Sequence, residues 1–456
     1  MKRDRPPGAA FGRGAPTLYL ERPRRPWRHT VRNHRGLVEH TRLAARTPLV
    51  LWIAGLVSLL AIPTTPARAQ WKGSVRDSAG VAIVRNPAIG LWTEAQRWTV
   101  REDLRIGAGE GRPEYQLGAI GWLDVGSDGR IYVLDTQGQH VKVFSAGGRY
   151  ERTIGGPGAG PGEIGRGATF VCVTSGDTLF VPDLANRRLN RYTAAGTPLA
   201  SVRLHLERGI PFIWRSTGTG IVAAQFRPIP LAAASPAEGR DAIVRVTPGG
   251  AMRDTLFTFA SGGSLRLAGQ TPEIRLYAPE PAWAIGAGGR LYQGVNSEYR
   301  IGVYATGGRL ERMITKPFTR KAVAEADRRT MLDYLMRAWR EAGATPAVLE
   351  RLKGVVTFGD YLPAYAALQA GPDGTLWVQQ LQAASTMSAE ERRTYNPLED
   401  AGGRGWDVFD REGRLLGVVT MPTRFAPRVF RGDRIYGVWR DDLDVSHVMR
   451  VLIERR

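Results

Sequence analysis

The sequence contains one cysteine and six histidines in 456 residues. A single cysteine cannot form an internal disulfide bond, so the stability of the fold must come from its core. Cys172 lies in an apolar segment, Phe170-Val-Cys-Val, where we expect a buried small side chain. After residue 69 the only histidines are His140, His205 and His447, and they lack the spacing of zinc ligands. We therefore expect neither a disulfide framework nor a zinc site.

Motifs of catalysis are also missing. The chain has no G-x-S-x-G, no H-E-x-x-H and no cysteine in a nucleophile context. Residues 160–165, GPGEIG, match G-x-G-x-x-G, but they lead into a strand rather than a helix, so the phosphate-binding mechanism is absent. We interpret this stretch as a loop between two repeats. No catalytic residue is predicted, and we expect a binding protein rather than an enzyme.

The net charge of +20 is unevenly distributed. Residues 1–69 hold 13 Lys plus Arg against three Asp plus Glu, which is half of the excess. A nucleic-acid site requires basic residues clustered and interleaved with aromatics, and no such cluster is present. We therefore expect a solvated, arginine-rich surface and no nucleic-acid partner.

An apolar run lies at residues 47–63, after Arg42 and Arg46 and before Ala67-Arg-Ala69. A positive flank, an apolar core and a small-x-small exit are typical of a secretory signal. We predict a signal peptide over residues 47–69, cleaved after Ala69, and export to the periplasm or the medium. The alternative is an uncleaved anchor that tethers a sensor, although the run is short for a membrane span.

The segment before the signal, residues 1–46, is predicted to be a disordered basic extension. The mature chain, residues 70–456, is then the folded domain. We expect it to have no stable membrane anchor after cleavage and to be a monomer.

Glycine is abundant, with 55 residues, and it punctuates short apolar strands. Residues 128–162 show the pattern best: three strands of about five residues joined by Gly-bearing turns, which predicts an antiparallel meander. A turn followed by such a strand recurs six times, and most copies have one strand before and two after. The six strands begin at Arg130, Thr178, Gly220, Arg290, Thr375 and Arg434. The predicted fold class is therefore all-β: a six-bladed β-propeller of four-stranded blades with a helical insertion.

The insertions account for the longer intervals between repeats. Residues 319–353 are helical by periodicity, with Gly343 between two helices and Thr345-Pro346 opening the second. This pair is expected to act as a lid or brace on the propeller, or alternatively to bind a partner. Residues 231–240, 261–280 and 385–403 are expected to be loop-like.

Ring closure is also suggested, because the last repeat lacks a strand. Residues 96–100 and 80–84 near the mature start are spare strands. An amino-terminal strand that completes the last blade would remove its open edge.

At these residues the chain resembles the six-bladed propellers related to NHL repeats, in their secreted bacterial branch. The resemblance is carried by residues 77–84, DSAGVAIV, by residues 128–163, and by residues 361–378, YLPAYAALQAGPDGTLWV. It covers roughly residues 75–455 and implies the propeller architecture. It carries over no catalytic residue.

Propellers bind ligands where the loops of all blades converge at one end of the channel. The loop between second and third strands lies on the same face as the loop between blades, so the last residue of each second strand is a candidate. These positions are Asp135, Asp183, Gln225, Val295, Gln380 and Trp439, and all except Val295 are predicted ligand contacts. For Asp135 and Asp183 the alternative is that each carboxylate binds the backbone of its own turn.

Oxygen ligands at four of the six positions also raise the possibility of a channel Ca²⁺, although only two are carboxylates. We predict no metal ligand and no cofactor. Tyr361, Tyr365, Trp214 and Trp439 either line a funnel suited to sugars or peptides or pack in the core. The sequence thus favours an exported, non-catalytic binding propeller for a protein, peptide or carbohydrate; the alternative is a Ca²⁺-dependent propeller hydrolase or lyase.

Overall fold

The computed structural model describes residues 70–455, except 175, 207–208, 218, 229–238, 269–270, 342 and 395–401. The predicted basic extension, residues 1–46, and the predicted signal peptide, residues 47–69, lie outside the described residues. So does most of the expected loop at 231–240. Within the described residues, no helix is both long enough and apolar enough to cross a membrane.

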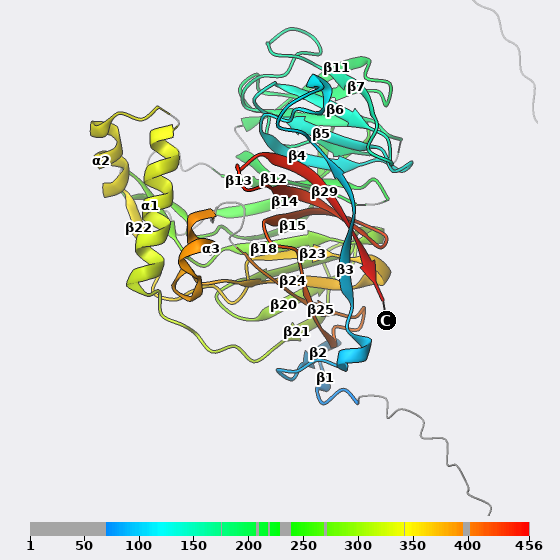
Figure 1. Ribbon diagram of the computed structural model, residues 1–456. Coiled ribbons are helices and arrows are strands. Elements are labelled where there is room, and N and C mark those ends of the chain that lie inside the picture. The colour runs from blue at the N-terminus through cyan, green and yellow to red at the C-terminus, as the bar shows by residue number, and fades with distance from the viewer. Residues whose placement is uncertain are drawn as a thin grey trace, which may run out of the picture. The chain divides into compact units, whose positions relative to one another are not determined.

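Most of the described strands form six blades (Figure 1). In each blade, four neighbouring strands pair antiparallel. Blade 1 consists of β4 (Ile120–Val125), β5 (Ile131–Asp135), β6 (His140–Phe144) and β7 (Tyr150–Ile154). Blade 2 consists of β8 (Cys172–Val173), β9 (Leu179–Asp183), β10 (Arg188–Tyr192) and β11 (Pro198–Arg203). Blade 3 consists of β12 (Ile210–Ser216), β13 (Val222–Arg227), β14 (Arg240–Val246) and β15 (Met252–Ala260).

The second half of the ring repeats this plan. Blade 4 contains β18 (Pro281–Ile285), β19 (Leu291–Val295), β20 (Arg300–Tyr304) and β21 (Leu310–Thr315). Blade 5 contains β23 (Ala367–Ala370), β24 (Leu376–Leu381), β25 (Gly402–Phe409) and β26 (Leu415–Thr420). Blade 6 contains β27 (Phe425–Arg431), β28 (Arg434–Arg440), β29 (Ser446–Glu454) and β3 (Thr99–Ile106). The predicted all-β class, six-bladed propeller and helical insertion are confirmed.

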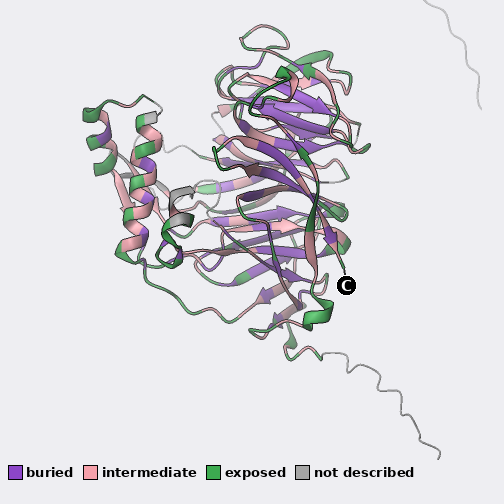
Figure 2. Cartoon of the chain, viewed as in Figure 1, coloured by how far each residue is buried: buried purple, intermediate pink, exposed green. Residues whose placement is uncertain are grey.

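The blades are held together by apolar clusters, one between each pair of neighbours around the ring. Between blades 5 and 6, for example, the Trp377 and Phe430 rings meet edge to face, with centroids 5.3 Å apart. Trp214 and Tyr365 are fully buried in two other clusters, so both side chains belong to the core. Buried residues accordingly concentrate within the strands (Figure 2). Each blade is stabilised by burying both sheet faces against its neighbours.

The ring is closed by the amino-terminal strand β3, which pairs antiparallel with β29, the last strand of the chain. The expectation that an amino-terminal strand completes the last blade is confirmed. Ile106 at the end of β3 is almost fully buried in the cluster between blades 6 and 1. Closure therefore contributes core as well as backbone hydrogen bonds.

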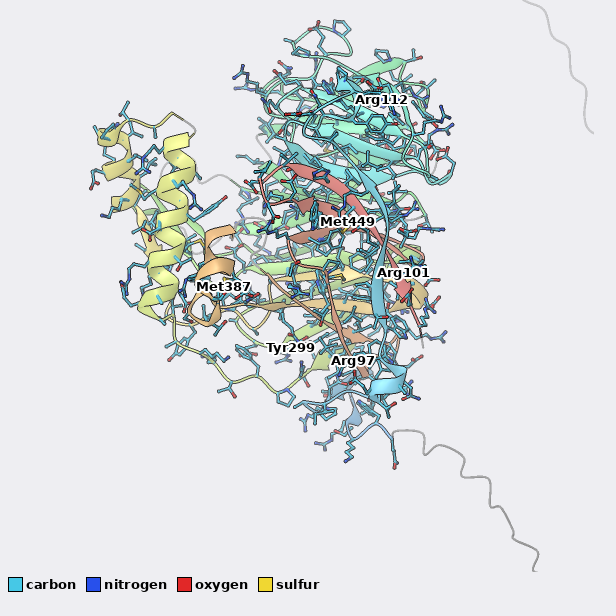
Figure 3. The ribbon with its side chains drawn as sticks, viewed as in Figure 1. Arg97, Arg101, Arg112, Tyr299, Met387 and Met449 are labelled. Atoms are coloured by element: carbon cyan, nitrogen blue, oxygen red, sulfur yellow. The ribbon has the colours of Figure 1, made fainter. Side chains whose placement is uncertain are left out.

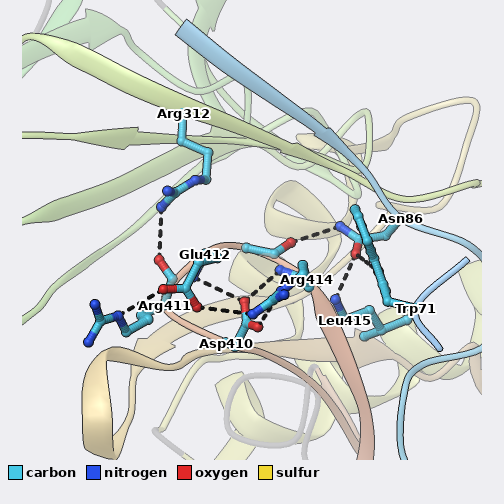
Figure 4. A network of polar contacts seen from close by, with 9 residues as sticks. Trp71, Asn86, Arg312, Asp410, Arg411, Glu412, Arg414 and Leu415 are labelled. Carbon is cyan, nitrogen blue, oxygen red and sulfur yellow. Dashed lines mark hydrogen bonds and ion pairs between the residues drawn. The ribbon is translucent and has the colours of Figure 1, made fainter. Parts of the chain in front are cut away.

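The other spare strand adds to blade 4 instead. β2 (Val81–Arg85) pairs in parallel with the outer strand β21, and β1 (Ser74–Ser78) pairs with β2, so this sheet has six strands. Asn86 follows β2 and is buried between blades 4 and 5 (Figure 4). Its amide nitrogen donates to the carbonyls of Thr315 and Gly413, at 3.2 and 2.9 Å, and its oxygen accepts from Leu415 N at 2.6 Å. One side chain thus fixes the amino-terminal segment to two blades.

The insertion after blade 4 contains α1 (Glu325–Glu341) and α2 (Pro346–Gly354), with Thr345 Oγ accepting from Val348 N at the start of α2. The expectation of a loop at 261–280 is wrong. That stretch contains β16 (Leu265–Ala268) and β17 (Thr271–Leu276), and β17 pairs in parallel with β22 (Val356–Phe358) after α2. β16 and β17 form a local hairpin, and the parallel pairing of β17 joins this hairpin to β22, a strand far along the chain that the local pattern could not reveal.

The insertion is attached to blade 5 through Asp327, a fully buried carboxylate near the start of α1. Its oxygens accept from Ala324 N at 3.0 Å and from Ser385 N at 2.7 Å. Ser385 belongs to a short turn after β24, which is followed by the helix α3 (Ala389–Thr394). This contact fits the brace that the sequence suggested for the helices.

Candidate functional site

The five predicted contacts lie at the ends of second strands, on the face that also carries the loops between blades. Asp135 and Asp183 are the last residues of β5 and β9, and Gln225, Gln380 and Trp439 lie one or two residues before the ends of β13, β24 and β28. The side chains of Asp135, Asp183, Gln225 and Gln380 enter separate hydrogen-bond networks, and they do not form one cluster. Trp439 packs against the Arg105 guanidinium instead. Their role as ligand contacts stays a prediction, and the networks show what each is positioned to do.

Asp135 is a buried carboxylate that organises two loops. It accepts from the backbone nitrogens of Gln137 and Gly138 in its own turn, both at 3.0 Å. It also accepts from Gly118 N at 2.9 Å and Ala119 N at 3.2 Å, in the loop that enters blade 1. Burial alone would raise the pKa of Asp135, but the backbone hydrogen bonds outweigh it, and the pKa lies below its usual value.

Asp183 has the same role in blade 2, and it is fully buried. Its Oδ2 accepts from Gly165 N in the blade-to-blade loop and from Asn186 Nδ2, both at 2.7 Å. Its Oδ1 accepts from Asn186 N at 3.1 Å in its own turn. Residues 160–165, which match G-x-G-x-x-G, are therefore part of the blade-to-blade loop that hydrogen-bonds to this carboxylate.

Gln225 is fully buried and bridges blades 3 and 4. Its Nε2 donates to Asp241 Oδ2 at 2.6 Å, and its Oε1 accepts from Trp283 Nε1 at 2.5 Å. Arg227 also donates to Asp241, at 2.9 Å, and to Glu280 at 3.0 Å. These partners use both ends of the Gln225 amide.

Gln380 belongs to a network around Asp407, a carboxylate with no exposed surface. Asp407 accepts from Gln380 Nε2 at 2.9 Å, Tyr299 Oη at 2.6 Å and Lys316 Nζ at 2.7 Å. Burial, and then the charge of Asp407, raise the pKa of Tyr299 well above its usual value. The tyrosine therefore stays protonated and donates a hydrogen bond to Asp407. The network joins blades 4 and 5 at the wall of a pocket of about 570 Å³.

Trp439 lines a second pocket, of about 400 Å³, between blades 5 and 6. The Arg105 guanidinium packs over its ring, 3.8 Å from the centroid. Phe425 and Trp406 add aromatic surface, and Gln379, Arg404, Arg424 and Asp442 add polar groups. Met387, beside α3, closes the side toward the helices (Figure 3).

The two pockets adjoin each other, because Gln382, Gly403 and Arg404 line both, and we refer to them together as the cleft over blades 4 to 6. Among the five predicted contacts, Gln380 and Trp439 line this cleft, and the others do not. Arg404, Asp407 and Trp406 were not predicted. They lie on or beside the third strand of blade 5, and their partners become apparent only once that strand is placed next to the second strand.

A different set of residues lies in the central channel, on the inner strands. Asp124 of blade 1 accepts from Arg431 Nη2 of blade 6 at 2.6 Å and from Ser216 Oγ of blade 3 at 2.5 Å. It also accepts from Val173 N of blade 2 at 2.8 Å. This network connects four blades across the axis. Its sequence signal is a charged residue within the first strand of a repeat, a position that a count along the second strands does not sample.

Asp135 and Asp183, the two carboxylates among the predicted contacts, already accept hydrogen bonds from backbone and side-chain amide nitrogens. Among the residues that the structure describes, no group of three or more His, Cys, Asp or Glu side chains is placed to hold a metal ion.

Comparison with known proteins agrees with the architecture. Residues 111–211 match a family described as a 6-bladed beta-propeller. No curated protein matches the chain. The resemblance to six-bladed propellers expected from the sequence is confirmed, and the chain is a six-bladed β-propeller.

Solved structures show a distant likeness. A Bacteroides fragilis protein named for its expected export is 12% identical, with 82% of this chain and 100% of that chain covered and a TM-score of 0.45. Virginiamycin B lyase from Staphylococcus aureus is 12% identical, with coverages of 78% and 99% and a TM-score of 0.38. Regucalcin from Agrobacterium tumefaciens, a calcium-binding protein, is 11% identical, with coverages of 78% and 96% and a TM-score of 0.37. No activity is carried over from them.

Replacing Asp135 with asparagine tests its contribution to the fold. We expect D135N to lose about 1–3 kcal/mol at pH 7, because an amide nitrogen then faces backbone donors. Since the pKa is lowered in the folded state, the stabilisation is complete above the unfolded-state pKa and declines as the pH falls through the folded-state pKa. Urea unfolding at pH 7 and pH 3 should therefore show the gap between D135N and wild type narrowing in acid; a gap independent of pH would contradict this.

Proposed function

We propose that this protein is an exported, non-catalytic binding propeller whose ligand occupies the cleft over blades 4 to 6. The observation that carries the proposal is the pocket around Trp439. Its volume of about 400 Å³ lies within the range of small-molecule sites, roughly 300–1,000 Å³. Aromatic walls with a few polar groups are the usual composition of such sites.

The lining favours a ligand with both an apolar face and hydrogen-bonding groups. The Arg105 guanidinium packs on one face of the Trp439 ring and restricts its rotation, so the ring is a rigid surface. Around the ring, Gln379, Arg404 and Asp442 offer hydrogen-bond donors and acceptors, and the last two carry opposite charges. A sugar ring or a side chain of a peptide has this chemistry, whether the peptide is free or belongs to a protein.

Truncation of Trp439 tests the site. We expect W439A to weaken binding by roughly 30-fold or more, because a buried aromatic anchor contributes about 2 kcal/mol or more. Titration calorimetry against a panel of mono- and disaccharides and dipeptides identifies the binding member in the wild type and measures it in the variant. Y150A, on the outer strand of blade 1, is the matched aromatic control and should bind normally. Equal affinity in W439A and wild type would place the ligand elsewhere.

The alternative is a calcium-dependent hydrolase or lyase. A resident ion would stabilise the folded state by mass action, by about 2.7 kcal/mol at one hundred times its dissociation constant. Under the binding proposal, neither CaCl₂ at about 5–10 mM nor excess EDTA should shift the melting temperature of the purified protein, with MgCl₂ as the control for ionic strength. A rise specific to calcium would favour the enzyme.

Export is supported by the basic flank, apolar core and Ala67-Arg-Ala69 of residues 42–69. We expect protein recovered from the periplasm or medium of a bacterial host to begin at Gln70 on amino-terminal sequencing. A chain that keeps residues 47–69 and sediments with membranes would support the tethered alternative.

A further inference from the structure

A third pocket, of about 410 Å³, lies at the other end of the molecule's axis, away from the predicted contacts. Its walls are inner strands and the turns that join first to second strands in blades 3 to 6, with Trp122 contributed by blade 1. Four arginines line it, Arg215, Arg290, Arg428 and Arg431, against one aspartate, Asp373. The lining therefore has a marked excess of positive charge.

The charges at the mouth are already balanced. Arg290 lies 3.7 Å from Glu311, and Asp373 lies 2.6 Å from Arg455. Arg431, deeper in, is paired with Asp124, and Asp124 also accepts from Val125 N, Val173 N and Ser216 Oγ. Asp124 therefore has no capacity left to neutralise a further cation.

Arg215 differs from Arg290 and Arg431, which both have a carboxylate partner. Its guanidinium lies over the rings of Trp122 and Trp283, at 5.4 and 6.0 Å, and Nη1 donates to Trp214 O at 3.2 Å. Among the described residues, neither Nε nor Nη2 has a hydrogen-bond partner, and no carboxylate is within ion-pair distance. Burial, together with the positive charge of Arg428, lowers the pKa of Arg215 to about 10.

Arg428 approaches the same aromatic ring, with its guanidinium 5.4 Å from the Trp122 centroid. Two cations are thus held around one indole inside a channel. A desolvated charge without a counter-charge is costly to keep, and a neutral side chain would be more stable there. A planar guanidinium fork is the donor geometry that matches carboxylate and phosphate groups.

We propose that this pocket, the channel site, binds the oxyanion group of a small molecule, a carboxylate or a phosphate, between Arg215 and Arg428 with Trp122 as its aromatic wall. The oxyanion supplies the acceptor that Arg215 Nη2 lacks and the counter-charge that the Arg215 guanidinium lacks among the described residues. The indole covers the organic portion of the ligand. This site is separate from the cleft around Trp439, because the two pockets have no lining residue in common.

The test uses the purified chain at constant ionic strength, with chloride replaced stepwise by inorganic phosphate in one series and by acetate or citrate in another. The wild-type melting temperature should rise with one series and saturate, which also identifies the preferred oxyanion. R215M should lose the saturable shift, corresponding to binding at least about tenfold weaker. R215K should keep some of it, because the charge remains without the fork.

R329M is the control, since Arg329 is an exposed arginine on α1, outside the pocket, and its removal changes the net charge equally. It should respond as wild type does. Without added anion, R215M should melt at or above the wild-type temperature, because the substitution removes an unbalanced charge. The proposal is overturned if no oxyanion shifts the wild type beyond chloride, or if R215M and wild type shift alike; the wild-type series decides it even if R215M does not fold.

Discussion

The structure depends on the packing of each sheet between two others in a closed ring. Among the described residues, the apolar side chains of each blade are buried mainly against the neighbouring blades. A four-stranded sheet alone would expose both faces to water, so the stability of every blade depends on the blades beside it. Closure by β3 makes the last of these interfaces, between blades 6 and 1, equivalent to the rest.

The two ends of the axis use charge differently. On the face of the second-strand ends, the buried carboxylates Asp135, Asp183, Asp241 and Asp407 each receive several donors and hold loops and neighbouring blades together. In the channel, arginines outnumber carboxylates, and Asp124 alone joins four blades. Buried acids here serve the architecture, whereas Arg215, which has no carboxylate partner among the described residues, is where we propose a ligand.

Much of the fold was predictable because its signals are local. A Gly- or Asp-bearing turn followed by a short, mainly apolar strand marks each second strand, and Thr345-Pro346 marks the start of α2. The destination of Val81–Arg85 was not predictable, because its parallel partner β21 lies more than two hundred residues away. A similar reason applies to residues 265–276, which were interpreted as loop: β17 of this hairpin pairs with β22, which follows the two helices.

The site was predictable to a smaller extent. Counting along each second strand identified Gln380 and Trp439, which line the cleft, because strand ends on one face converge in a propeller. It did not indicate that the Gln225 amide would hydrogen-bond to Asp241 and Trp283, since those partners come from other strands. The channel arginines were missed because only the ring brings Arg215 of blade 3, Arg428 of blade 6 and Trp122 of blade 1 together.

The pairing of β3 with β29 also sets the order in which the chain can become native. During synthesis β3 is among the first strands to emerge, and Ser446–Glu454 is the last. The amino-terminal strand must therefore wait, with an open edge, until nearly the whole polypeptide is available. Blade 6 and both of its interfaces are completed only then, and contacts between such distant segments slow folding. A chain that stops before Ser446–Glu454 leaves β3 without its partner, so the closed ring depends on the synthesis of this strand.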